Sequence, residues 1–284
     1  MPPGSGTDLA PFTLFAPAKV NLALHVLGRR ADGYHDLDSI VAFADVGDWL
    51  SFSPAEKYEV TVDGPFAAAV PETSGNIITR AWEAATLIAA RRERALPPVR
   101  VHLSKNLPVA SGIGGGSSNA AAALKGFLRI AGINGLDDEI IGHGLKIGAD
   151  VPVCLQAQAC RMQGVGERIV PLAGFAPRRA ILVNPLVEVS TPEVFRGLGL
   201  ARGDMFAGGI EDADNAARWR NDLAAPAIAQ APVIGQVLAM LSKAHGVTRA
   251  FMSGSGATCV GLYEGEPGEL KLDPRWWMAR TVLS

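Results

Sequence analysis

Cysteine is scarce in this chain of 284 residues, and neither sign of charge dominates it. Its three cysteines, Cys154, Cys160 and Cys259, are odd in number and form no C-x-x-C pair, which argues against a disulfide framework and favours a reducing compartment. The five histidines show no H-x-x-x-H spacing, which argues against a transition metal held by the protein. We therefore expect no protein-held metal site and a cytoplasmic protein.

Long apolar runs and basic blocks are also missing. No stretch of about 18 apolar residues marks a membrane helix, and the N-terminal residues lack the basic and apolar regions of a signal peptide. The net charge of -2 comes without a polybasic block, an aromatic ladder or zinc-finger spacing, so we expect neither nucleic acid nor a membrane as a partner. With 48% hydrophobic residues, the chain is long enough for one large or two medium domains.

The most informative stretch is residues 107–123, LPVASGIGGGSSNAAAA. Alternating apolar residues at 99–103 predict a strand before it, and the alanines at its end predict a helix after it. Ser117, Ser118 and Asn119 are candidates to cap that helix. The glycines between strand and helix allow left-handed dihedrals and a close approach of the backbone to a ligand.

Phosphate is the ligand that this bend favours, because loop amides and the positive end of the helix dipole converge on one place. A Walker A loop is excluded, since no lysine follows Gly112 at the required spacing. A dinucleotide fingerprint is excluded too, since Ser117 or Asn119 stands where the third glycine of G-x-G-x-x-G belongs. The alternative is a glycine-rich turn without a ligand.

Lys19 lies within an apolar, alternating stretch at residues 12–26 that predicts a strand. A lysine there is either a charged strand edge or a functional group. After this strand, residues 28–39 predict a turn that exposes Tyr34 and His35. An aromatic ring beside a histidine suits stacking on a base, and it equally suits the anchoring of a loop.

Asp150 follows a predicted helix at residues 136–148, whose dipole disfavours a negative charge at that end. Pro152 disfavours a helical conformation of Val151, which predicts a sharp turn at the aspartate. Asp150 is therefore either a functional carboxylate or the cap of a following helix. Asn76 opens another helical pattern, and it is either an N-cap or a ligand-facing residue.

The remaining patterns predict alternating strands and helices, which is typical of an α+β protein. The predicted strands are 40–52, 58–62, 180–189, 248–253 and 257–263, and the predicted helices are 191–198 and 233–244. Residues 200–219 predict a surface loop with a short helix, and the pair Trp276-Trp277 predicts a closing strand.

Four segments in this order, PAKVNLALHVLGRRADGYHDL, LPVASGIGGGSSNAAAAL, GADVPV and FMSGSGAT, resemble the GHMP superfamily of small-molecule kinases. The match spans nearly the whole chain. The first segment most closely resembles the branch that acts in the non-mevalonate isoprenoid pathway. Asn119 stands where that branch often has aspartate.

The resemblance implies a two-domain α+β fold. It implies an N-terminal domain at residues 11–172, with a left-handed β-α-β crossover and a glycine-rich ATP loop, and a C-terminal ferredoxin-like domain at residues 173–284. It also implies ATP as phosphoryl donor, with Mg²⁺ carried by the nucleotide.

The resemblance assigns roles to the residues already singled out. Lys19 and Asp150 match the catalytic pair, in which Asp150 accepts the proton of the acceptor hydroxyl and Lys19 offsets charge. Asn76 matches a residue near the adenine. The residues that match the phosphate-binding segment are Pro108, Val109, Ala110, Ser111, Gly112, Ile113, Gly114, Gly115, Gly116, Ser117 and Ser118.

The implied reaction is the phosphorylation of the 2-hydroxyl of 4-(cytidine 5'-diphospho)-2-C-methyl-D-erythritol. Tyr34 and His35 match its cytosine site, with Phe195 as a second stacking face, and Asn21 and Thr191 match further substrate contacts. Phe195 suits the core side of a short helix equally well. The alternatives are a kinase of another small alcohol, such as homoserine or mevalonate, and a non-catalytic binding protein of the same fold.

Overall fold

The computed structural model describes residues 10–71, 76–212 and 215–284. The chain forms two compact units that interleave along the sequence. The first unit combines Met1–Ala16, Gly47–Val109 and Gly116–Leu155, and the second combines Pro17–Val46, Ala110–Gly115 and Gln156–Ser284. Two long strands, β1 (Phe12–Arg29) and β2 (His35–Pro54), each contribute residues to both units. The expected domain boundary between residues 172 and 173 remains a prediction.

The sheet of the first unit contains the end of β2, β3 (Glu59–Asp63) and β4 (Val99–Ser104). β2 and β4 are antiparallel, from the pair Trp49 and Ser104 to the pair Pro54 and Val99. β3 and β4 are parallel neighbours, and the helix α1 lies between them in sequence. These elements form a β-α-β connection, and the left-handed crossover that the resemblance implies stays a prediction.

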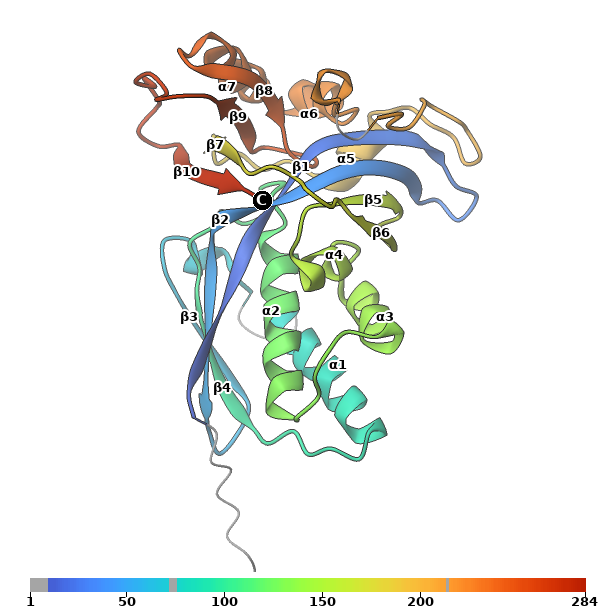
Figure 1. Ribbon diagram of the computed structural model, residues 1–284, viewed down its shortest axis with the longest axis vertical. Coiled ribbons are helices and arrows are strands. Elements are labelled where there is room, and N and C mark those ends of the chain that lie inside the picture. Colours follow the sequence, from blue (N-terminus) through green and yellow to red (C-terminus); the bar gives the residue numbers. More distant parts are fainter. Residues whose placement is uncertain (1–9, 72–75, 213–214) are drawn as a thin grey trace, which may run out of the picture. The chain divides into compact units, whose positions relative to one another are not determined.

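The described residues of the first unit also form one short 3-10 helix and four α-helices. They are η1 (Ala67–Ala69), α1 (Ile77–Arg91), α2 (Gly115–Ile130), α3 (Asp138–Ile147) and α4 (Val151–Gln156). In Figure 1, α1, α2 and α3 lie on one side of β3 and β4. An aromatic cluster joins these layers, since Phe127 of α2 packs edge-on against Phe52, Tyr58 and Trp82 at centroid distances of 5.6, 6.1 and 5.1 Å. This cluster anchors α2, whose N-terminal turn follows the glycine loop.

The second unit contains antiparallel strands in the order β10-β7-β9-β8. The first part of β2 pairs with β5, and β5 pairs with β6. The strands are β5 (Cys160–Gly164), β6 (Arg168–Pro171), β7 (Arg178–Asn184), β8 (Val247–Met252), β9 (Cys259–Tyr263) and β10 (Trp277–Leu283). The helices are α5 (Thr191–Arg196), η2 (Ala216–Arg218), α6 (Ala224–Gln230) and α7 (Val233–Lys243). Val194, Ile234, Val237 and Leu241 from these helices pack with Ile181 in one apolar core.

Most predicted elements are present, and the α+β class is confirmed. The alternating patterns failed to predict β5, β6 and α6, because segments of five, four and seven residues are too short to show a clear hydrophobic period. The Trp276-Trp277 pair does open a closing strand, since β10 begins at Trp277. The expected loop with a short helix at 200–219 contains η2, while residues 213 and 214 lie outside the described residues.

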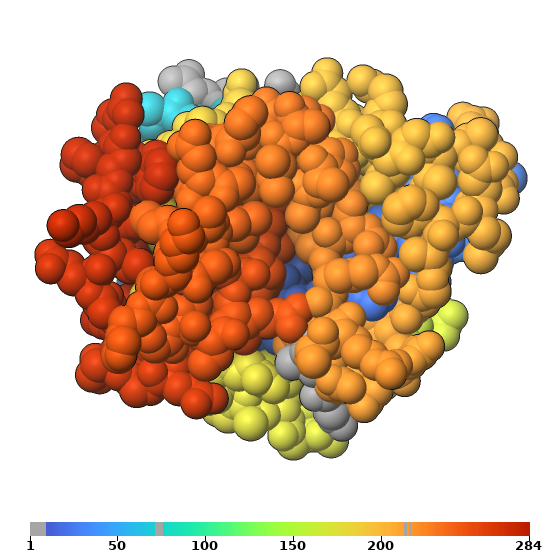
Figure 2. Space-filling model, turned by 90° about the horizontal axis from the view of Figure 1, so that it is seen from above, coloured from blue at the N-terminus to red at the C-terminus, as the bar shows by residue number. Residues whose placement is uncertain are grey.

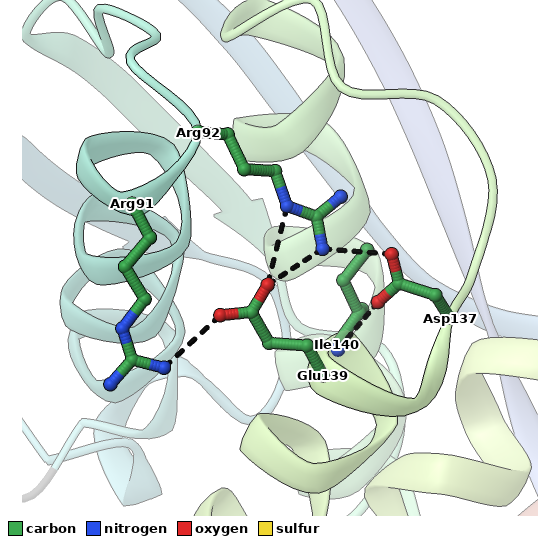
Figure 3. Close-up of polar contacts among 5 residues, drawn as sticks. All are labelled: Arg91, Arg92, Asp137, Glu139 and Ile140. Carbon is green, nitrogen blue, oxygen red and sulfur yellow. Dashed lines mark hydrogen bonds and ion pairs between the residues drawn. The ribbon is translucent and has the colours of Figure 1, made fainter.

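A polar network connects the end of α1 to the start of α3 (Figure 3). Asp137 caps α3 by accepting from Ile140 N at 3.0 Å, and Arg92 donates to Asp137 and to Glu139, both at 2.8 Å. Arg91 donates to the other oxygen of Glu139 at 3.1 Å. The backbone bond from Ile140 and the Arg92 guanidinium hold the pKa of Asp137 below its usual value, and Arg92 and Arg91 do the same for Glu139.

Removing Arg92 should therefore lower stability in a pH-dependent way. A carboxyl group whose pKa is lowered in the folded state contributes stability above its unfolded pKa, and the contribution is lost as the pH falls through the folded pKa. Arg92→Ala should melt slightly below the wild type at pH 7, and the difference should narrow as the pH is lowered towards 3. Differential scanning calorimetry between pH 7 and pH 3 measures these melting temperatures, and a substitution at the exposed Arg94, Arg94→Ala, is the control. A difference in melting temperature that stays constant with pH would contradict the assignment.

Candidate functional site

Lys19 lies on β1 and is buried, with 4% of its surface exposed. Its Nζ donates to Asn21 Oδ1 at 2.9 Å, and Asn21 Nδ2 donates to Ser39 Oγ at 2.8 Å. Ser39 Oγ donates in turn to the Ala23 carbonyl at 2.6 Å. An ammonium group is costly to bury unless polar partners hold it, so Lys19 is not a solvated edge charge. Its position supports the functional interpretation.

The glycine loop lies directly against Lys19. Its backbone is left-handed at Ala110, Gly112 and Gly114, with φ of 51°, 76° and 63°. The Ile113 carbonyl accepts from Lys19 N at 2.8 Å. A Cβ atom on Gly114 would lie 2.9 Å from Lys19 Cβ, so only glycine permits this approach of the loop to the strand.

The C-terminal S-G-S-G segment and the threonine that follows it contact the same loop. Ser253 Oγ donates to the Gly112 carbonyl at 2.9 Å and accepts from Asn21 N at 3.0 Å. Thr258 donates to the Ser111 carbonyl through its Oγ1 at 2.6 Å and through its N at 3.1 Å. Two consecutive loop carbonyls are therefore occupied by protein groups, and Ser253 links the loop to the strand that carries Lys19.

The helix α2 begins at Gly115, earlier than the sequence indicated. Ser117, Ser118 and Asn119 therefore lie inside the helix, and the prediction that one of them caps it is wrong. Gly115 and Gly116 are helical although glycine has a low helix propensity, because the rest of α2, which is packed in place, determines their conformation. Gly116 is exposed, and a Cβ atom on it would meet no atom within 4 Å. Open space thus lies beside the first turn, where N–H groups have no partner within a helix.

Asp150 immediately precedes α4. Val151 is helical, so the prediction that Pro152 excludes it from a helix is wrong. Proline is tolerated in a first helical turn, because the N–H that it lacks would have no partner there. Asp150 follows the C-terminus of α3, as predicted, and it also lies at the positive end of α4, so the two helix dipoles act on its charge in opposite directions. A Cβ atom on Gly148 would lie 3.9 Å from Ser117 Oγ, so the turn before Asp150 runs past the first turn of α2.

Asn76 caps α1, as predicted. Its Oδ1 accepts from Ile78 N at 2.9 Å, and its Nδ2 donates to the Pro71 carbonyl at 3.2 Å. Because both ends of the amide contact the protein, the proposed contact of Asn76 with adenine stays a prediction.

The candidate cytosine residues lie in the second unit. The His35 ring stacks on Phe195 with a centroid distance of 4.7 Å and an interplanar angle of 30°. Burial and the nearby Arg29 lower the pKa of His35, so the imidazole is neutral at pH 7. Tyr34 is 65% exposed, and Thr191 Oγ1 lies 2.7 Å from Ser255 Oγ. The stacking partner of Phe195 is thus His35, and Phe195 also packs against the apolar core.

An open pocket of about 430 Å³ is lined by His25, residues 207–211, Arg218 and Arg220. Figure 2 shows blue atoms of the N-terminal part of the chain between orange segments. Burial and Arg220 lower the pKa of the His25 imidazole. Arg220 pairs with Asp222 at 2.7 Å, and Arg218 pairs with Glu211. Each pocket arginine therefore already has a carboxylate partner.

All three cysteines are buried, and none of them forms a disulfide within the described part of the chain. Burial raises the pKa of Cys160 to about 11, although the nearby Lys19 opposes this, and burial raises the pKa of Cys259 to about 12. Among residues 10–71, 76–212 and 215–284, no group of three or more His, Cys, Asp or Glu side chains is arranged to hold a metal ion. The same residues include no helix long and apolar enough to cross a membrane.

Sequence reasoning missed the roles of Ser253 and Thr258. Both stand in FMSGSGAT, which marked the resemblance but carried no assigned contact. Their hydroxyl groups bond to loop residues about 140 positions away, at separations of 141 and 147 residues, so no local pattern could have shown the pairing.

A buried lysine against a glycine loop at the start of a helix is the kind of site that a phosphoryl-transfer enzyme needs. Two family models match the chain, GHMP kinases N terminal domain at residues 76–158 and GHMP kinases C terminal at residues 201–272. The chain belongs to the GHMP kinases, and the predicted family is confirmed.

Several relatives carry one particular name. The chain is 47% identical to the 4-diphosphocytidyl-2-C-methyl-D-erythritol kinase of Dinoroseobacter shibae, covering 99% of this chain and 98% of the relative. It is 44% identical to the kinase of the same name from Paramagnetospirillum magneticum, with 96% and 98% covered. A solved structure of 4-(cytidine 5'-diphospho)-2C-methyl-D-erythritol kinase matches with a TM-score of 0.75 and 30% identity, covering 96% of this chain and 99% of that one.

A more distant structure shows the fold alone. Homoserine kinase from Cytophaga hutchinsonii matches with a TM-score of 0.63 at 13% identity, over 98% of this chain and 96% of that one. The predicted two-domain GHMP kinase fold is confirmed by these matches.

The open space at Gly116 can be tested by filling it. Gly116→Ala should raise the melting temperature, because alanine is favoured over glycine in a helix by up to about 1 kcal/mol. If phosphates occupy this space, the methyl group should also raise the KM for ATP about tenfold, the scale of one lost hydrogen bond to a charged group.

Gly142→Ala is the matched control, because Gly142 lies within α3 and a Cβ atom there also meets no atom within 4 Å. It should raise the melting temperature and leave the KM for ATP unchanged. Equal KM values for the two variants would place the phosphates elsewhere.

Proposed function

We propose that this chain is an ATP-dependent kinase that phosphorylates the 2-hydroxyl of 4-(cytidine 5'-diphospho)-2-C-methyl-D-erythritol in the non-mevalonate isoprenoid pathway. The observation that carries the proposal is the buried Lys19, held by Asn21 and bonded through its main chain to Ile113 of the glycine loop. The names of relatives at 42 to 47% identity support the choice of acceptor.

The glycine loop and the first turn of α2 bind the phosphates of ATP in this proposal. The left-handed Gly112 and Gly114 carry no side chain into the loop, and the open space at Gly116 leaves room beside the helix terminus. Backbone N–H groups at the positive end of a helix suit a phosphate without further charge. The Lys19 ammonium offsets the negative charge that develops during transfer.

Asp150 is the proposed general base. It accepts the proton of the 2-hydroxyl as the new P–O bond forms, and the phosphoryl group leaves ADP. Asp150 immediately precedes the N-terminus of α4, a position where the helix dipole is favourable to a negative charge. Lys19 and Asn21 orient the acceptor, and Thr191 is a further proposed contact.

Magnesium is expected to arrive with ATP. Mg²⁺ is usually bound through one or two carboxylates together with substrate phosphates, rather than by a cage made of protein alone. The turn that precedes Asp150 runs past Ser117, so Asp150 and Ser117 are the residues that would hold the ion beside the phosphates. When bound, the ion neutralises phosphate charge.

We also propose a cytoplasmic location, which suits three cysteines that form no disulfide.

The proposed activity can be tested by measuring ADP release with a panel of acceptors. The cytidine-bearing acceptor should be used, while homoserine and mevalonate should not. Asp150→Asn should lower kcat by about 10² to 10⁴ and leave the affinity for ATP nearly unchanged, because a general base acts on the acceptor. Turnover of homoserine or mevalonate would favour another small-alcohol kinase, and a chain that binds but never turns over any acceptor would be a binding protein.

The cytosine site can be tested on its two aromatic residues. Tyr34→Ala should raise the KM for the cytidine substrate by the equivalent of about 1 to 3 kcal/mol, the scale of one base stacked on a ring. Because Tyr34 is exposed, the Tyr34→Ala variant should keep the melting temperature of the wild type. Phe195→Ala should raise the same KM and also lower the melting temperature, because this ring packs against the core. If both variants keep the wild-type KM, the cytidine assignment fails.

A further inference from the structure

Asp48 is a buried carboxylate that the proposed mechanism does not use. It is fully buried, and four donors converge on it. Asn106 N and Leu107 N donate to Oδ1 at 2.6 and 2.9 Å, while Lys105 Nζ and Asn119 Nδ2 donate to Oδ2, the latter at 2.9 Å. Lys105 and Asn119 are themselves 3% and 2% exposed.

The strand register explains how Asp48 reaches this position. Trp49 of β2 pairs with Ser104 of β4, so Asp48, one residue earlier, lies opposite Lys105, one residue later. The chain leaves β4 at this point and continues into the glycine loop. The carboxylate therefore meets the backbone where the loop begins.

The other end of the loop meets the same carboxylate. Asn119 lies in α2, close after the helix begins at Gly115, and its amide donates to Asp48. One carboxylate thus bonds both to the amides that enter the loop and to the helix that leaves it. The distance that the loop must span is fixed between these two attachments.

We propose, on the basis of the proposed function, that Asp48 is the positioning residue of the phosphate-binding loop. Its carboxylate holds both ends of the loop, so that the left-handed turns between them present their amides to ATP in one geometry. Lys105 balances its charge, and Asn119 supplies a donor without adding charge. Burying a carboxylate is costly without such partners, so a purely structural site could have been filled by apolar residues instead.

Asp48→Asn tests the proposal directly. An amide in this place keeps the size of the carboxylate, but its NH2 group must face at least one of the four donors, so one end of the loop is released. The affinity for a non-hydrolysable ATP analogue should fall by about tenfold to a hundredfold, the scale that misplacement by about 1 Å produces. The affinity for the cytidine substrate should stay near that of the wild type. Calorimetric titration of each ligand measures this split.

Asn119→Ala is the milder variant, because it removes one donor and leaves the bonds to Lys105 and to the loop amides. It should also lower the affinity for the ATP analogue, by a smaller factor than Asp48→Asn does. Phe127→Leu is the matched control, since it loosens the buried aromatic cluster of the same helix away from the loop. This control should lower the melting temperature while the affinity for the analogue is unchanged.

The outcomes separate this inference from the proposed function. If the wild type binds the analogue and both Asp48→Asn and Asn119→Ala bind it equally well, Asp48 is structural and the inference is wrong. If Phe127→Leu lowers the affinity for the analogue as much as Asn119→Ala does, general loosening of α2 explains the effect and the inference is again wrong. A wild type that binds no ATP analogue would remove the proposed function and the inference together.

Discussion

The burial of one ammonium group determines how the second unit is built around its site. Lys19 has almost no contact with water, so its charge needs polar partners and a backbone that can approach closely. Asn21 and Ser39 supply the partners. Gly114 supplies the space, because any larger residue would collide with the lysine side chain. The glycine loop and the lysine strand are therefore one arrangement, and neither could keep its conformation without the other.

The same loop is constrained from separate parts of the sequence. Ser253 and Thr258 occupy the carbonyl groups of Gly112 and Ser111, and in the first unit Asp48 holds the residues that enter the loop. Electrostatic catalysis depends on groups that are already oriented before the substrate arrives. The carbonyl groups of Ser111, Gly112 and Ile113 already accept hydrogen bonds from the protein, which fixes these peptide groups before a ligand arrives.

Much of the fold and part of the site could be predicted from the sequence. Periodicity predicted the strand of Lys19 and the capped helix of Asn76, because both depend on neighbouring residues. It failed at Asp150, where a helix begins despite Pro152, and at Ser117, because the packing of α2 extends the helix into the glycines. These patterns could not predict the role of Asp48. It lies inside a predicted strand, and its partners come from the residues that follow β4 and from α2, through tertiary contacts alone.

The burial of the cysteines has a consequence for inhibitor chemistry. A thiol attacks an electrophile as the thiolate, and at neutral pH a thiol with a pKa of about 11, such as Cys160, is almost entirely protonated. Although the charge of the nearby Lys19 acts on Cys160, its thiol stays protonated and does not react readily with a covalent inhibitor. Compounds directed at this site must gain their affinity from non-covalent contacts with the loop and the lysine strand.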